Sequence, residues 1–200
     1  GFSSRIVFAL FQGESYGFVG SRSFLRDVVN PGFSCKSTLV KSGKDDEYGC
    51  LNPARPSIKF ADLGEIAGMI AVDQVGHAVA NDILYVHSDG DDLATLLQYS
   101  ATDDVSVVAS NAADNGNGYP YPPSPLTSLL SITGGGVGGA VLTGFDNSFT
   151  SKVPYHSHLD TAEYINLDTI AAAATIVARA AVAAAYGGDD AANTAKNLIP

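Results

Sequence analysis

The sequence has few basic residues. Eleven Lys and Arg stand against twenty-one Asp and Glu, which gives a formal net charge of −10. A negatively charged surface repels phosphate backbones and anionic lipid headgroups, so this balance argues against nucleic acid as a partner. No Asn-x-Ser/Thr sequence occurs either, and glycosylation therefore does not indicate the compartment.

A long, strongly apolar run is also lacking. The longest candidate, residues 170–186, is mostly alanine and contains Arg179. A membrane span needs about 20 strongly apolar residues, so we expect no transmembrane helix here. The first four residues include neither an initiator Met nor the basic and apolar regions of a signal peptide, and we interpret Gly1 as a cut end.

Cysteine is scarce as well, since Cys35 and Cys50 are the only two and flank a polar loop. A disulfide bond between them would close a loop of about 15 residues and stabilise the fold by ~3 kcal/mol, provided the compartment is oxidising. The alternative is two separate thiols, because free cysteine is often buried. We favour the disulfide bond.

Apolar runs alternate with helical patterns along the 200 residues, of which 46% are apolar. We expect a central strand at residues 6–12, buried on both faces, and a helix at residues 22–29 capped by Ser21. Further strands are expected at 66–72, 83–86, 105–109 and 140–143, and helices at 91–99, 126–132 and 166–186. Residues 111–125, rich in Asn, Gly, Pro and Tyr, are expected to form an exposed loop.

This alternation predicts a single domain with a three-layer α/β fold and a mainly parallel sheet. Ligands of such sheets gather at the carboxyl ends of strands, so functional residues are expected just after Gln12, Val72 and Thr143. If residues 6–12 are central, strands from residues before Gly1 must pair with them, because open buried edges invite aggregation. We therefore expect the chain to fold poorly by itself.

Residues 13–17 (GESYG) match the Gly-x-Ser-x-Gly turn on which a serine nucleophile is exposed. Ser15 would be the nucleophile, with His156 or His158 downstream as the base. Hydrolases of that fold draw part of their oxyanion hole from a loop well upstream, and only twelve residues precede Gly13. A serine hydrolase is therefore the weaker of two enzymatic alternatives.

Three segments resemble the zinc-dependent aminopeptidases. Residues 13–21 (GESYGFVGS) resemble that family's Gly-Glu-Glu followed by Gly-Ser, which places Glu14 at the general-base position and Ser15 where a zinc-ligating Glu belongs. A neutral hydroxyl is a far poorer zinc ligand than a carboxylate. Residues 155–165 (YHSHLDTAEYI) resemble the family's His-Ser/Thr-x-x-Asp-Thr and place His156 at a ligand position. Asp73, in Asp-Gln-Val-Gly, resembles a later ligand, and the two upstream ligands would precede Gly1.

Purely structural interpretations stand beside these. A histidine near a turn is usually hydrogen-bonded or exposed, which is how we interpret His77, His87 and His158. Thr161, with the Asp before it, can cap a turn, and Glu14 can be a solvated loop residue. The glycine-rich run at residues 134–139 is interpreted as a turn, because no Lys-Ser/Thr follows it as a phosphate-binding loop requires.

Among relatives of these peptidases, the combined pattern most resembles the nicastrin family, large luminal subunits of the γ-secretase membrane protease. Residues 11–14 (FQGE), 19–22 (VGSR) and 160–166 (DTAEYIN) carry the resemblance, with support from 60–64, 122–126 and 139–142. These matches span most of the chain in the right order. Two positions depart from the family: His156 is kept where nicastrins tend to lose it, and Phe18 stands where the family can carry a Tyr.

The resemblance implies an aminopeptidase-like (phosphorylase/hydrolase-like) luminal or extracellular domain over residues 1–200, as a fragment that lacks the first strands. It implies a non-catalytic subunit that recognises or sterically selects stubs of type I membrane proteins. No cofactor and no bound metal are expected, and Asp73 and His156 become vestigial ligand positions. Glu14, Ser15, Phe18 and His156 become substrate-binding candidates, with Glu14 facing a free amino terminus.

The implied partners are the remainder of the protein's own chain and subunits of the presenilin, Aph-1 and Pen-2 type, with the membrane anchor outside this chain. The first alternative is an active zinc aminopeptidase that uses Glu14 as base and Asp73 and His156 as ligands.

Overall fold

The computed structural model of the chain describes residues 4–29, 39–42, 47–50, 66–77, 82–90, 92–111, 121–147 and 158–200. Contacts divide the chain into two compact units. The first, here the sheet unit, comprises residues 1–10, 68–127 and 138–200. The second, here the turn unit, comprises residues 11–67 and 128–137.

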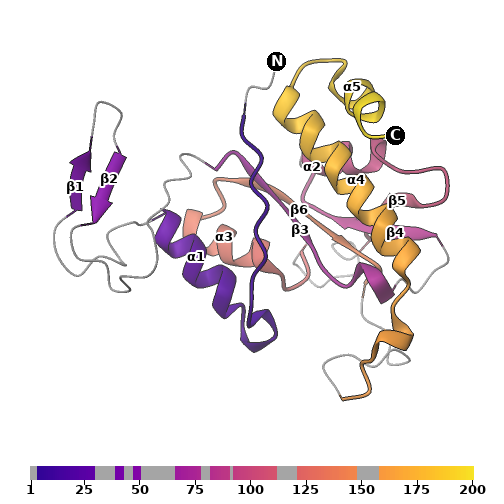
Figure 1. Cartoon of the computed structure of the whole chain (residues 1–200), viewed down its shortest axis with the longest axis horizontal. Coiled ribbons are helices and arrows are strands. Elements are labelled where there is room, and N and C mark those ends of the chain that lie inside the picture. Colours follow the sequence, from indigo (N-terminus) through magenta and orange to yellow (C-terminus); the bar gives the residue numbers. More distant parts are fainter. Residues whose placement is uncertain are drawn as a thin grey trace. The chain divides into compact units, whose positions relative to one another are not determined.

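The sheet unit is built on a four-stranded sheet of β3 (Gly68–Val72), β4 (Ile83–His87), β5 (Ser106–Ala109) and β6 (Gly138–Thr143). The strand order is β3-β6-β4-β5 (Figure 1). β3 runs parallel to β6 and β4 parallel to β5, whereas β4 and β6 are antiparallel. The α/β class with a mixed, mainly parallel sheet is thus confirmed, and all four strands lie where the sequence predicted them.

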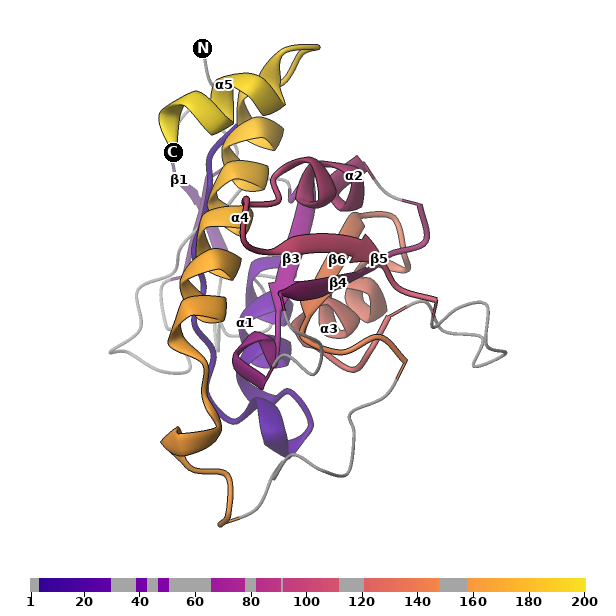
Figure 2. The ribbon, with the colours of Figure 1, turned by 90° about the vertical axis from the view of Figure 1, so that its right-hand side faces the viewer.

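One face of this sheet is covered by α2 (Asp92–Tyr99) and α4 (Leu167–Tyr186), which lies alongside the strands in Figure 2. Ala173 and Ala180 of α4 lie in the core that this helix shares with α2 and the strands. Buried core residues come from both helices, from the strands and from the turn before β5: Leu84, Val86, Ala94, Leu97, Val105, Val107, Ala140, Leu142, Ala173, Ile176 and Ala180.

The opposite face is met by the start of α3 (Pro125–Thr133). Leu126 is fully buried, and its Cδ2 lies 2.8 Å from the point where a Cβ on Gly139 would stand. Gly139 belongs to β6 and points away from the face that α4 covers, because side chains alternate along a strand. Helical residues therefore lie on both faces of the sheet.

The start and packing of α4 follow from its sequence. Asn166 precedes the helix, and its side-chain oxygen accepts hydrogen bonds from the N–H groups of Asp168 (3.0 Å) and Thr169 (3.2 Å). Among the described helices, α4 alone is long and apolar enough to cross a membrane by length and composition, with a mean hydropathy of 1.6. Composition by itself therefore did not exclude a span. The inward face of α4 belongs to the core described above.

The C-terminal end of the sheet unit packs on α4. α5 (Ala191–Leu198) lies against it through Ala183, Ala191 and Ala195. The guanidinium of Arg179 donates hydrogen bonds to the backbone carbonyls of Ser100 (3.2 Å), Ala101 (3.1 Å) and Ile199 (2.9 Å).

The predicted central strand at residues 6–12 is wrong. Residues 5–11 form no strand and pair with no strand of the described sheet. Phe8 and Leu10 are 78% and 101% exposed. A continuous apolar run fits a strand buried on both faces only where neighbouring strands supply hydrogen bonds, and the run itself does not reveal whether they exist. The structure instead leaves this segment as an exposed apolar stretch.

The turn unit contains η1 (Glu14–Tyr16), α1 (Val19–Val29) and the antiparallel pair β1 (Leu39–Ser42) and β2 (Glu47–Cys50). The predicted helix is confirmed, but it begins three residues early. Ser21 therefore lies inside α1 and is not its cap; the carboxylate of Glu14 caps this helix instead. Cys35 lies outside the described residues, so the disulfide stays a prediction.

Candidate functional site

The candidate site is the turn by which the chain enters α1. Gly13 (φ 75°) and Gly17 (φ 82°) flank η1, and Phe18 precedes α1 with φ 59°. Glycine adopts such angles readily, whereas a residue with a Cβ is strained by about 1–2 kcal/mol. The turn is held by backbone hydrogen bonds from Phe18 N–H to the Glu14 carbonyl and from Arg22 N–H to the Phe18 carbonyl, both 2.9 Å. The strained angle at Phe18 is thus fixed on both sides.

Glu14 serves the helix as well as the turn. Its Oε1 accepts a hydrogen bond of 2.8 Å from the backbone N–H of Ser21. The first N–H groups of a helix have no partner within the helix, and a negative charge is favoured there. The other oxygen, Oε2, is enclosed and has no hydrogen-bond partner in the described part of the chain. One oxygen of this carboxylate is therefore fixed, and the second is uncommitted.

Gly20 allows this geometry. A Cβ at this position would stand 3.0 Å from both Gln12 N and Glu14 Oε1, and closer still to the Gln12 carbonyl oxygen. Any larger residue would push the carboxylate or the incoming backbone away. This role of Gly20 was not predicted from the sequence, although the Gly-Ser of residues 20–21 was a signal for it.

Ser21 fixes the turn through its buried hydroxyl. It is fully buried, and its hydroxyl lies 3.3 Å from the hydroxyl of Ser128 and 3.4 Å from the Phe18 carbonyl. The rings of Phe11 and Phe24 pack with their centroids 5.4 Å apart. The serine pair joins α1 to the later part of α3 within the turn unit, and the ring pair joins α1 to the residues that precede η1. The sequence pattern did not predict the serine pair.

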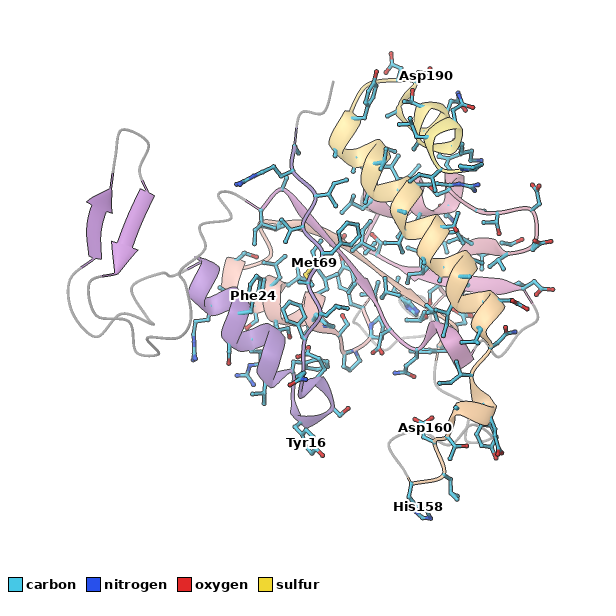
Figure 3. All side chains as sticks on the ribbon, viewed as in Figure 1. Tyr16, Phe24, Met69, His158, Asp160 and Asp190 are labelled. Carbon is cyan, nitrogen blue, oxygen red and sulfur yellow. The ribbon has the colours of Figure 1, made fainter. Side chains whose placement is uncertain are left out.

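Ser15 and its neighbour Tyr16 are both exposed, and Tyr16 projects outward from the turn in Figure 3. Residues 11–67 and 128–137, which make up the turn unit, contain no histidine. The imidazole that a serine nucleophile needs is therefore not supplied by the unit that carries Ser15.

Asp73 lies directly after β3, at the carboxyl end of a parallel strand as predicted. It is half-buried, and its N–H donates to the Leu142 carbonyl at 3.1 Å, which extends the ladder between β3 and β6. The next residue, Gln74, has φ 54°, and its Oε1 is buried without a partner among the described residues. This strained glutamine carried no signal in the sequence.

The other candidates are spread out. His158 and Asp160 are exposed and project from the segment before η5 (Ala162–Tyr164) in Figure 3. Thr161, expected to cap this turn, makes no side-chain capping bond. His156 and the side chain of His77 lie outside what the structure describes. Over the described ranges, no three His, Cys, Asp or Glu side chains gather as a metal site.

The comparison with known proteins decides the family. A family model described as the nicastrin large lobe matches residues 2–186. The chain belongs to the nicastrin family. Nicastrin of Arabidopsis thaliana is 26% identical over 204 residues, covering 98% of this chain and 26% of that protein. Nicastrin of Homo sapiens is 26% identical over 165 residues, covering 82% of this chain and 20% of that protein.

The fold agrees with this assignment. The crystal structure of the γ-secretase component nicastrin matches with a TM-score of 0.70 at 20% identity, covering 99% of this chain and 36% of that one. This nicastrin-family chain therefore spans about a quarter, or less, of the length of the curated relatives named above. The family resemblance predicted from the sequence is confirmed, and the matched range includes the Glu14 turn, Asp73 and His156.

Proposed function

We propose that this nicastrin-family chain is part of a non-catalytic subunit of a γ-secretase-type intramembrane protease complex. In that complex it recognises the exposed amino-terminal ends of type I membrane protein stubs on the luminal or extracellular side. Support comes from the family match and from the solved nicastrin, which is itself a γ-secretase component. Presenilin, Aph-1 and Pen-2 type subunits are the partners we propose.

The observation that carries the proposal is the half-committed carboxylate of Glu14. Its Oε1 is oriented by Ser21 N–H, so the side chain loses little further freedom on binding. An ammonium group that reaches Oε2 forms a charge-assisted hydrogen bond, which contributes about 1.5–3 kcal/mol. A free peptide amino terminus supplies that group.

The enclosure of Oε2 has a kinetic consequence. In the structure this oxygen is out of contact with solvent, so an amine reaches it only after the side chain or its cover moves. Binding that requires such a movement associates more slowly than docking to an open site. Recognition at Glu14 should therefore have a slow association rate.

The neighbouring position supports binding without cleavage. An aminopeptidase of this pattern needs a carboxylate ligand beside its general base, and Ser15 offers an exposed neutral hydroxyl instead. Without a metal to polarise the scissile carbonyl, Glu14 retains only its charge for the substrate amine. Phe18, whose backbone fixes the turn, and His156 complete the proposed substrate-binding set.

The test uses the full-length protein in its native complex and two synthetic peptides of one stub sequence, with a free or an N-acetylated terminus. Wild type should prefer the free amine by about 10-fold to 150-fold, the equivalent of 1.5–3 kcal/mol. Glu14→Gln should abolish that preference, because the amide keeps an oxygen for Ser21 N–H but has no charge. Glu163→Gln, which removes an exposed carboxylate, is the matched control and should leave the preference intact. Equal affinity of wild type for both peptides would contradict the proposal.

A further inference from the structure

The sheet unit also contains a buried polar cluster, formed by His87, Thr143 and Phe145. His87 ends β4 and is 1% exposed, and Thr143 ends β6 and is fully buried. His87 Nε2 lies 2.8 Å from Thr143 Oγ1 and 3.2 Å from the Phe145 carbonyl oxygen. His87 pairs with Val141, so both side chains point to the face opposite α2 and α4.

The hydrogen bonds fix the tautomer of His87. A carbonyl oxygen only accepts, so Nε2 must carry the proton that faces Phe145. The Thr143 hydroxyl donates to the same carbonyl at 2.7 Å, which leaves its lone pair to accept from Nε2. Nδ1 then holds a lone pair, and it is buried with no partner within the described residues. A second proton on this ring would be a buried charge whose N–H has no acceptor.

The surroundings favour the neutral ring. Burial lowers the pKa of His87, and this outweighs the Phe145 carbonyl and the charge of Asp146, which both raise it. Asp146 faces the ring from the segment after β6. Tyr85 is the other titratable group on the same face of β4, and the sequences of β5 and β6 contain none.

Residues 144–147, here the latch segment, are held against the sheet by contacts with this cluster. The ring of Phe145 packs against that of His87, with the centroids 5.8 Å apart. Asp146 Oδ1 accepts hydrogen bonds from the Ser110 hydroxyl (2.8 Å) and from the Asn111 N–H (2.9 Å) just after β5. The latch segment thus joins the ends of β4, β5 and β6.

We propose that His87, Thr143 and the Phe145 carbonyl form an acid-sensitive latch: neutral His87 holds the latch segment on the sheet, and protonation of His87 releases it. Above about pH 6.5, the usual pKa of histidine, the ring is neutral whether the latch is closed or open, and the latch is fully stable. Below that pH only the open form takes up a proton. The closed population then falls relative to the open one by up to about tenfold per pH unit.

Hydrogen exchange on the full-length protein in its complex tests this between pH 7.5 and pH 5.0, after correction for the intrinsic exchange rate. In wild type, peptides over the latch segment and residues 110–111 should lose protection by up to about tenfold per pH unit below about pH 6.5. His87→Gln should remove this dependence, because its amide keeps a donor for Thr143 and Phe145 but does not titrate. His158→Gln replaces an exposed histidine and should behave as wild type.

Protection in wild type that does not change with pH overturns the proposal. So does a pH dependence in His87→Gln that equals that of wild type. If His87→Gln fails to fold, Thr143→Val provides the second test, since it keeps the shape of the side chain but removes the hydroxyl between His87 and Phe145. The latch predicts that this variant loses protection in the latch segment already at pH 7.5. Wild-type protection in Thr143→Val overturns the proposal.

Discussion

The carboxylate of Glu14 lies 2.8 Å from the backbone nitrogen of Ser21 and accepts its hydrogen bond. The residue proposed to bind the substrate therefore also caps the first turn of α1. This double duty makes a simple deletion of the side chain ambiguous, because lost recognition and a lost cap would appear together. Substitutions that separate the two roles follow from the geometry.

Glu14→Ala and Glu14→Gln should differ in stability. The alanine variant leaves the Ser21 N–H without its acceptor and should lower the free energy of unfolding by about 0.5–2 kcal/mol. The glutamine variant retains an oxygen at that point and should lose much less. Denaturant unfolding of the full-length protein measures both, and equal losses would show that the carboxylate does not act as the cap.

Gly20→Ala should destabilise the turn. Its Cβ would meet the backbone of Gln12 and the carboxylate of Glu14. Such overpacking costs roughly 1–3 kcal/mol. Gly136→Ala is the control, since a Cβ there would only touch the Thr133 carbonyl oxygen at 3.5 Å. Thermal unfolding of the two variants compares them, and a Gly20→Ala protein as stable as the control would show that the entry to α1 is not tightly packed.

Asn166→Ala should weaken the start of α4 by about 1 kcal/mol, because two backbone N–H groups lose the side-chain oxygen that caps them. Asn166→Asp keeps an oxygen there and should be close to wild type. Hydrogen exchange at Asp168 and Thr169 reports the effect locally. Unchanged protection in Asn166→Ala would mean that packing of α4, and not its cap, fixes this end.

Helices and strands whose ends are set by neighbouring residues could be predicted from the sequence. α4 shows its cap at Asn166, and β4 is bounded by turn residues, so both lie where the pattern predicted. Residues 6–12 could not be placed in this way, because whether an apolar run is buried depends on neighbours far away in the chain. The start of α1 was predicted too late because an N–H group of its first turn is capped by Glu14, in the preceding turn, and not by the residue directly before the helix.

The site was predictable only in part. Motif spacing indicated Glu14 and Ser15, and a strand end indicated Asp73. The pairing of Ser21 with Ser128 and the tautomer of His87 depend on residues far apart in the chain, which no local pattern contains. The reason for Gly20 depends on the folded shape of a turn only a few residues long. His87 was interpreted as either a hydrogen-bonded or an exposed residue, and the structure shows it hydrogen-bonded and buried.

Ser15 should not react as an enzymatic nucleophile. It is exposed, and the unit that contains it has no histidine to serve as its base. A fluorophosphonate probe should therefore leave Ser15 unlabelled in the full-length protein, with wild type and Ser15→Ala giving the same signal. Labelling that disappears in Ser15→Ala would establish the serine-hydrolase alternative.

Glu14 is proposed to bind a peptide amine without cleaving the peptide. To test this, the zinc content of the purified full-length protein is measured first. The protein is then incubated with a stub peptide that has a free amino terminus, and the peptide is followed by mass spectrometry. The peptide should stay intact, with or without added zinc. Removal of the first residue that depends on zinc and is lost in Glu14→Gln would contradict it and establish an active aminopeptidase.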